Sequence, residues 1–313
     1  MMNNAPQDDL GFVLRRLPGH IFAVLDGAHF NNLPARLREV GLEYFPLYVD
    51  ETDAPQLNTG PHLVVCRTGY AVEQVRDVAA GAPTVVWWSW PDTGAEPEIE
   101  IYRHLRRLNL MDVPWSYGQQ SAPRDGALHT HGTAEPVLFR HSDPDVFAAL
   151  LPVLVTPQKA RLFGGANAVV FQPTNRAEVV HMRNPVPNLP VPFGRLRLSA
   201  EQFAELNAAY GVSLRRRALV DFGKQLSPGI PRVLRESRIT DAVTRAESYA
   251  LATREQVWDF IRMDLRYGAR FELEKARSGV LVQLRDPDLP AEERLFRAQQ
   301  EMGFLERYIQ PQP

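Results

Sequence analysis

Short apolar runs alternate with amphipathic segments along the first half of the chain. Runs rich in valine, isoleucine and aromatic residues are typical of strands, whereas apolar residues that recur every three or four positions are typical of helices. This alternation predicts a fold of the α+β or α/β class, with a mixed N-terminal α/β lobe around a central sheet. We expect strands at residues 21–26, 43–50, 62–67, 84–90 and 111–117, with helices at 31–41, 71–81 and 98–108.

The pattern changes after a proline-rich stretch. Residues 173–192 hold five prolines, and proline in that density disfavours both helices and central strands. Beyond it the apolar positions keep helical spacing, in segments 198–211, 213–226, 241–252, 253–268 and 289–308. We therefore expect an α/β lobe over residues 1–183, a proline-rich linker over 184–198 and an all-α helical lobe over 199–313.

Composition agrees with two packed units in a soluble protein. The chain has 313 residues, of which 44% are hydrophobic and 23% charged, and this length is about twice that of a usual domain. The single cysteine, Cys66, excludes an internal disulfide and fits a reducing compartment. Because the first residues lack the pattern of a signal peptide, we expect a cytoplasmic protein.

Charge and motifs narrow the possible functions further. The formal net charge is -2, so no overall positive field would attract nucleic acid, and no apolar run reaches the ~20 residues that membrane insertion needs. The sequence has no GxSxG, GxGxxG, GxxxxGK[ST] or HExxH motif. We therefore expect no cofactor, no metal and no enzymatic activity.

The cluster His141-Ser142-Asp143 resembles an active site but is better explained as a helix start. Asp143 precedes Pro144, and this order is typical of an N-cap residue followed by the first helical residue. The same order returns at Thr156 and Pro157, and the helix that they open is expected to end at Gly164. Two enzymatic alternatives stay open: an acid-base pair of His141 and Asp143, and a metal-binding pair of His129 and His131.

Two sets of residues are candidates for contact with a partner protein. Arg103, Arg106 and Arg107 form a basic helix face, which is more often only solvated. Trp88 and Trp90 lie on one side of a strand; they are expected to fill the core, although tryptophan and arginine also dominate protein interfaces.

A set of short motifs occurs in a fixed order over about residues 20–170. Its residues are Leu25, Asp26, Gly60, Pro61, Leu63, Val64, His104, Leu105, Arg106, Arg107, Phe139, Arg140, Asp143, Pro144 and Val146. This ordered set resembles the adaptor-chaperones of the bacterial type VI secretion system, a family with a two-lobed domain long labelled as of unknown function. One departure is the loop at 115–135, which is longer than the tight turn that this family leads us to expect.

The resemblance implies a task without catalysis. Such an adaptor holds a toxic effector in the cytoplasm and docks it on the secretion spike, which is the VgrG protein or its PAAR tip. Two other hypotheses remain: an enzyme of unrecognised type, such as a hydrolase, that uses the histidines named above, and a helical lobe that is itself a toxin. The second has no catalytic constellation between residues 199 and 313 to support it.

Overall fold

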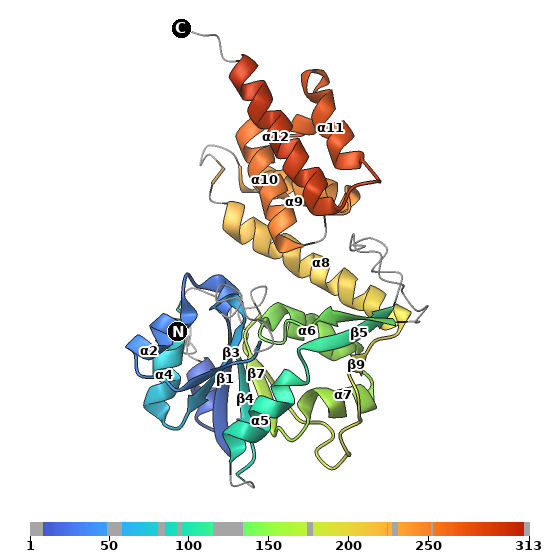
Figure 1. Cartoon of the computed structure of the whole chain (residues 1–313). Helices are drawn as coiled ribbons and strands as arrows, with labels where there is room; N and C mark the ends of the chain where they lie inside the picture. The colour runs from blue at the N-terminus through green and yellow to red at the C-terminus, as the bar shows by residue number, and fades with distance from the viewer. Residues whose placement is uncertain are drawn as a thin grey trace, which may run out of the picture. The chain divides into compact units, whose positions relative to one another are not determined.

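The computed structural model describes residues 9–48, 58–80, 85–92, 96–114, 134–173, 178–223, 225–226, 231–251 and 253–309. Contacts divide the chain into two compact units, Met1–Pro114 with Thr133–Tyr210, and Trp115–Gly132 with Gly211–Pro313. The first unit is mixed α/β around a central antiparallel sheet and the second is helical, as the sequence predicts (Figure 1). The division falls within one helix, between Tyr210 and Gly211.

The first unit is built on a six-stranded sheet in the order β2-β3-β1-β4-β7-β8, in which all neighbours are antiparallel. Its strands are β1 (His20–Asp26), β2 (Tyr44–Pro46), β3 (Pro61–Cys66), β4 (Val85–Trp90), β7 (Ala168–Phe171) and β8 (Val180–Arg183). The three central strands are almost wholly buried, which explains why they read as continuous apolar runs.

Helices cover both faces of this sheet (Figure 1). They are α1 (Asp9–Leu14), α2 (Leu33–Glu39), α4 (Gly69–Val78), α5 (Pro97–Arg106), α6 (Pro144–Val153) and α7 (Thr156–Phe163), with a 3-10 turn η1 (Gly27–His29) after β1. Neighbouring residues of a strand point to opposite faces. Trp87 therefore packs with the leucines and valines of α2 and α4, whereas Trp88 contacts Phe147 of α6.

A second, three-stranded sheet has the order β6-β5-β9, with β5 (Leu110–Pro114), β6 (Ala134–Leu138) and β9 (Leu196–Arg197). The segment 184–198 that the sequence assigns to a linker contains β9, which pairs in parallel with β5. Strand β8 was not predicted at all. It is the edge strand of the sheet, so one of its sides pairs with no other strand. Prolines near an edge strand are tolerated for this reason.

The helical unit contains more helix than the sequence pattern shows. Its helices are α8 (Ala200–Phe222), which begins in the first unit, α9 (Arg232–Ser248), α10 (Arg254–Tyr267), α11 (Ser278–Arg285) and α12 (Ala291–Ile309), with 3-10 turns η3 (Phe271–Leu273) and η4 (Lys275–Arg277). The expected break near Gly211 is wrong, because α8 continues through it. A helical glycine costs only about 1 kcal/mol relative to alanine, and Leu214, Ala218 and Phe222 anchor the following turns in the core.

Arginine and carboxylate groups are paired beside the core of this unit. Arg245 donates two hydrogen bonds to Glu272, at 2.6 and 2.7 Å, and one to Asp264. Asp264 also pairs with Arg238 at 3.2 Å. Both carboxylates are almost completely buried, so each guanidinium compensates a charge that would otherwise destabilise the folded state.

Candidate functional site

The cluster at residues 141–143 is a helix start, as the sequence predicts. The carboxylate of Asp143 accepts hydrogen bonds from the backbone N–H groups of Asp145 at 2.9 Å and Val146 at 3.4 Å. Pro144 is the first residue of α6. Asp143 is therefore the N-cap, and its negative charge lies at the positive end of the helix dipole.

The start of α7 differs by one residue from the expectation. The N-cap is Val155 and Thr156 is already helical, with Pro157 after it. Valine has no polar side-chain atom, so the side chain of Gln158 reaches back and accepts a hydrogen bond from Val155 N at 2.9 Å. This bond is one half of a capping box, and the half that a threonine N-cap would supply is not made. The predicted end of the helix at Gly164 is present.

His141 is completely buried behind the second sheet. Its Nε2 lies 2.9 Å from Oδ1 of Asn109, while the Asn109 amide donates to the carbonyl of Leu47. Asn109 therefore offers an acceptor, and His141 donates from Nε2. Burial, with a smaller contribution from His104, lowers the pKa of His141 to about 3. The ring is thus neutral at neutral pH and is held as part of the core.

Asp26 and Arg140 join two parts of the first unit that are far apart in the sequence. The Arg140 guanidinium pairs with the buried Asp26 carboxylate, whose other oxygen accepts from Ala28 N at 3.1 Å. Burial alone lowers the pKa of Arg140, but the carboxylates of Asp26 and Asp143 outweigh it and raise the pKa above its usual value. The motif residues of β1 and of the turn before α6 therefore stabilise one another.

His104, on α5, is packed between two tryptophans and Gly164. Its ring contacts Trp88 and Trp90, and its Nε2 lies 3.0 Å from the carbonyl of Leu162. A Cβ atom on Gly164 would come within 2.4 Å of this ring. The glycine at the end of α7 is therefore required twice, for its φ of 53° and for the space that His104 occupies.

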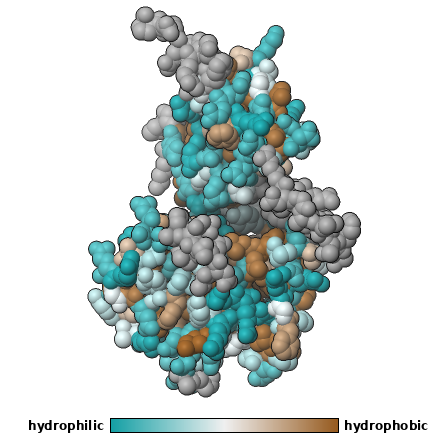
Figure 2. Space-filling view, viewed as in Figure 1, coloured by the Kyte–Doolittle hydropathy of each residue, from teal (hydrophilic) through white to brown (hydrophobic). Residues whose placement is uncertain are grey.

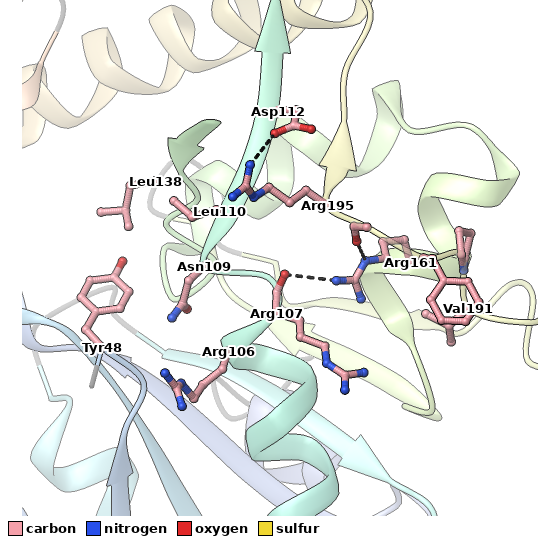
Figure 3. A pocket seen from close by; sticks show the side chains of 13 residues that line it. Tyr48, Arg106, Arg107, Asn109, Leu110, Asp112, Leu138, Arg161, Val191 and Arg195 are labelled. Carbon is pink, nitrogen blue, oxygen red and sulfur yellow. Dashed lines mark hydrogen bonds and ion pairs between the residues drawn. The ribbon is translucent and has the colours of Figure 1, made fainter. Parts of the chain in front are cut away.

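A surface hollow of about 870 Å³ lies in the first unit, where the end of α5 meets the second sheet (Figure 3). We call it the arginine hollow, because four of its side chains are arginines and only one is acidic. It is lined by Tyr48, Arg106, Arg107, Asn109, Leu110, Asp112, Leu138, Arg161, Val191, Pro192, Phe193, Gly194 and Arg195. Five segments contribute to it: the chain after β2, the α5–β5 connection, β6, α7 and the chain before β9.

The positive charges of the arginine hollow are only partly compensated by carboxylates. Arg161 is 7% exposed, and it donates to the carbonyls of Gly194 at 2.7 Å and Arg107 at 3.1 Å (Figure 3). Among the described residues, neither Arg161 nor Arg107 has a carboxylate within ion-pair distance. Burial, and next the nearby Arg107, lower the pKa of Arg161. An anion in the hollow would relieve this repulsion.

Asp112 is the single acidic side chain of the arginine hollow. Its two carboxylate oxygens lie 3.4 Å from Arg195 and 3.8 Å from Arg197. One carboxylate thus serves two arginines, of which Arg195 lines the hollow (Figure 3).

Apolar side chains also reach the surface at the arginine hollow. Leu110 and Leu138 face each other across β5 and β6 and are 38% and 53% exposed. Phe193 is 105% exposed, so its ring is fully accessible to solvent. On the face seen in Figure 2, hydrophobic patches lie among mostly hydrophilic side chains. Exposed apolar area of this kind beside arginines is typical of interfaces.

The helical unit has a hollow of the opposite charge. A space of about 720 Å³ is lined by residues of α10, α12 and the turns before them, including Glu255, Asp259, Glu292 and Glu293, together with Phe296. Asp259 and Glu293 pair with arginines of their own helices. The acidic lining therefore carries less net charge than its composition alone indicates.

The structure separates the residues predicted for partner contact. Arg106 and Arg107 line the arginine hollow, while Arg103 is exposed one turn earlier on α5 and does not line it. Trp88 and Trp90 are buried in the sheet core, which matches the expectation that they fill it. Sequence reasoning missed Arg161, Phe193 and Arg195, which lack any shared motif and meet only through the fold.

His129, His131 and almost all of the loop 115–135 lie outside the described residues. Within the described ranges, no group of three or more histidine, cysteine or acidic side chains is arranged to hold a metal ion. In the same part of the chain, every helix is too short or too polar to cross a membrane.

Burial raises the pKa of the Cys66 thiol to about 12.

Comparison with known proteins gives a match to a family model over part of the chain. No curated protein and no solved structure matches it. The matched segment of the chain begins in β1 and ends in α7, so it contains Asp26, Arg106, Arg107 and Arg140 but not the chain before β9. Residues 21–161 match the family model described as a domain of unknown function, DUF4123.

Proposed function

We propose that this protein is an adaptor of the type VI secretion system that binds one cognate toxic effector in the cytoplasm and loads it onto the secretion spike, VgrG or its PAAR tip. It acts by binding and performs no catalysis. The observation that carries the proposal is the DUF4123 match over residues 21–161, the same stretch whose ordered motifs resemble those adaptors.

The places of the motif residues support this proposal. Asp26 and Arg140 pair with each other, His104 packs against Gly164, and Asp143 caps α6. These residues stabilise the α/β unit, and none of them shapes a pocket for a reacting group. A shared scaffold with a separate contact surface suits an adaptor, because the partner can differ while the scaffold stays the same.

The acid-base alternative of His141 and Asp143 gains no support from the positions of these two residues, whereas His129 and His131 lie outside the described residues. His141 is fully buried and neutral, and the carboxylate of Asp143 accepts a backbone hydrogen bond at the N-terminus of α6. A general acid or base has to reach its substrate within hydrogen-bond distance. Two buried side chains that serve the core do not meet this condition.

The test is recovery of the partners from the native bacterium. The chain carries an affinity tag, is expressed at its natural level, and is purified from the cytoplasm for mass spectrometry and size-exclusion chromatography. We expect one toxin-like protein and a spike component in a stable complex. A clean monomer without partners, from cells that actively assemble the secretion system, would contradict the proposal.

A further inference from the structure

We propose that the arginine hollow binds an acidic polypeptide segment that also carries apolar side chains. The inference deepens the proposed function and rests on it for the identity of the partner, because that segment would belong to the effector. Its chemistry follows from the hollow itself. The hollow offers cationic groups for carboxylates and exposed apolar groups for an aliphatic or aromatic anchor.

Charge determines which partner is favoured. The hollow is lined by Arg106, Arg107, Arg161 and Arg195 and by a single acidic residue, Asp112. The chain as a whole has a formal net charge of -2, so this surface is a local exception. A guanidinium binds a carboxylate through two parallel hydrogen bonds, and such pairs are among the stronger polar contacts in interfaces.

Arg161 is prepared for this role by the backbone around it. Its Nε and Nη2 are held by the carbonyls of Gly194 and Arg107. Its Nη1 has no hydrogen-bond partner among the residues that the structure describes. Because the guanidinium is already oriented, little side-chain entropy is lost when a carboxylate binds to Nη1.

The apolar lining distinguishes a polypeptide from other anions. Leu110, Leu138 and Phe193 are exposed at the same hollow that the arginines line. Nucleic acid would be expected to meet a longer basic stripe and stacked aromatics, and an inorganic anion would gain nothing from leucine. An acidic segment with leucine or phenylalanine between its carboxylates satisfies both kinds of group.

The volume of the hollow agrees with a short segment of chain. About 870 Å³ is available, which is within the range of pockets that hold drug-sized ligands. The arginines come from α5, α7 and the chain before β9, so they can contact carboxylates at several positions along one segment. The proposed site is therefore an anchor point within a larger interface.

The first experiment measures peptide binding by fluorescence anisotropy with the full purified chain. The probe is a fluorescein-labelled twelve-residue peptide of alternating glutamate, aspartate and leucine. The controls replace its acids with lysine, or its leucines with serine. We expect saturable binding of the acidic apolar peptide that weakens with salt, and weaker binding of both controls. Equal binding of the lysine peptide, or no binding of the acidic one, would overturn the inference.

Variants tie the binding to the hollow. We expect R106E/R107E to lower the affinity for the peptide by roughly tenfold or more. The control R36E/R38E reverses the charge of two exposed arginines of α2 in the same unit and should leave the affinity unchanged. D112N removes the competing carboxylate and should tighten binding, which a misfolded variant would not do. Equal affinity in R106E/R107E and the wild type would reject the hollow as the site.

The outcome is separable from that of the proposed function. If the native partners co-purify equally with the wild type and with R106E/R107E, the adaptor function stands and the assignment of the hollow fails. If no partner co-purifies but the acidic peptide binds and R106E/R107E abolishes it, the hollow is a binding site of a protein with another task.

Discussion

The guanidinium of Arg140 pairs with the carboxylate of Asp26, although 114 positions separate the two residues in the chain. Asp26 ends the central strand β1, and Arg140 lies in the turn before α6. The pair thus joins two distant segments of the first unit at a point where Asp26 is almost completely buried. Removal of Arg140 leaves the Asp26 carboxylate without its compensating charge in the core.

We therefore expect R140M to lower the free energy of unfolding by about 3 kcal/mol, as other broken buried pairs do. The measurement is urea unfolding followed by circular dichroism. A matched control is R183M, at an exposed position of the edge strand β8, which should change stability little. The double variant D26N/R140M should recover part of the loss, because it removes both charges; a strictly additive result would argue against a direct pair.

The buried histidines make stability depend on acid. Burial lowers the pKa of His141 to about 3 and that of His104 to about 4, from a usual value of 6.5. Below pH 6.5 the unfolded chain binds protons that the folded chain does not, so stability decreases as pH falls toward the folded pKa values.

The variant H141Q tests this dependence. The free energy of unfolding is measured between about pH 6 and pH 4.5, which lies between the folded and unfolded pKa values of His141. We expect its slope against pH to be smaller in H141Q than in the wild type by about 1.4 kcal/mol per pH unit. H20Q is the control, since His20 is part-exposed on the edge of β1. An unchanged slope in H141Q would mean that His141 is not the buried neutral group described above.

Gly164 and Gly41 form a natural comparison, because both have positive φ, at 53° and 72°. A Cβ on Gly41 would meet nothing within 4 Å, whereas one on Gly164 would lie 2.4 Å from the His104 ring. We expect G41A to cost about 1 kcal/mol, from the backbone alone, and G164A clearly more. Thermal unfolding of both variants measures the difference, and equal losses would contradict the contact with His104.

The arginines of α5 should differ in their effect on partner binding. Charge reversal at Arg103, Arg106 and Arg107 together is expected to weaken a partner complex while the melting temperature stays nearly unchanged, because all three side chains are at least partly exposed. Since only Arg106 and Arg107 line the hollow, R103E alone should weaken the complex much less than R107E. A large loss of melting temperature would show that these residues are structural instead.

Cys66 should be chemically inert in the folded protein. It is buried at the end of β3, and burial raises the pKa of its thiol to about 12. The reactive thiolate is therefore scarce at neutral pH. We expect iodoacetamide to modify almost none of the Cys66 thiol in buffer and all of it in concentrated urea, as measured by intact mass. Rapid reaction in buffer would mean that β3 opens readily.

Local patterns in the sequence predict the scaffold better than the candidate site. The apolar runs identify β1, β3 and β4, and Asp143 with Pro144 identifies the start of α6, because these signals act within a few residues. Two helical segments were predicted over 198–211 and 213–226, where the structure has the single helix α8, because the contacts that sustain the helix come from other parts of the chain.

The arginine hollow could be found only in part from the sequence. Arg106 and Arg107 belong to a visible basic face, but Arg161 and Arg195 are single arginines in segments without a basic pattern. They reach the same hollow because α7 packs beside β9 and β9 pairs with β5. The spacing of these arginines along the chain does not predict that they lie close together, because their proximity depends on the pairing of strands that are distant in sequence.

The strands that follow residue 161 also determine where this protein can be cut. A fragment that ends at residue 161, where the DUF4123 match ends, would keep Arg106 and Arg107. It would lose β7 and β8 from the main sheet, which leaves β4 unpaired on one side, and it would lose β9 with the preceding wall of the hollow. The backbone of Met111 and Asp112 would then lack its ladder partners Leu196 and Arg197. An unpaired strand of this kind invites association with other chains, so such a fragment should aggregate even though the family match is intact.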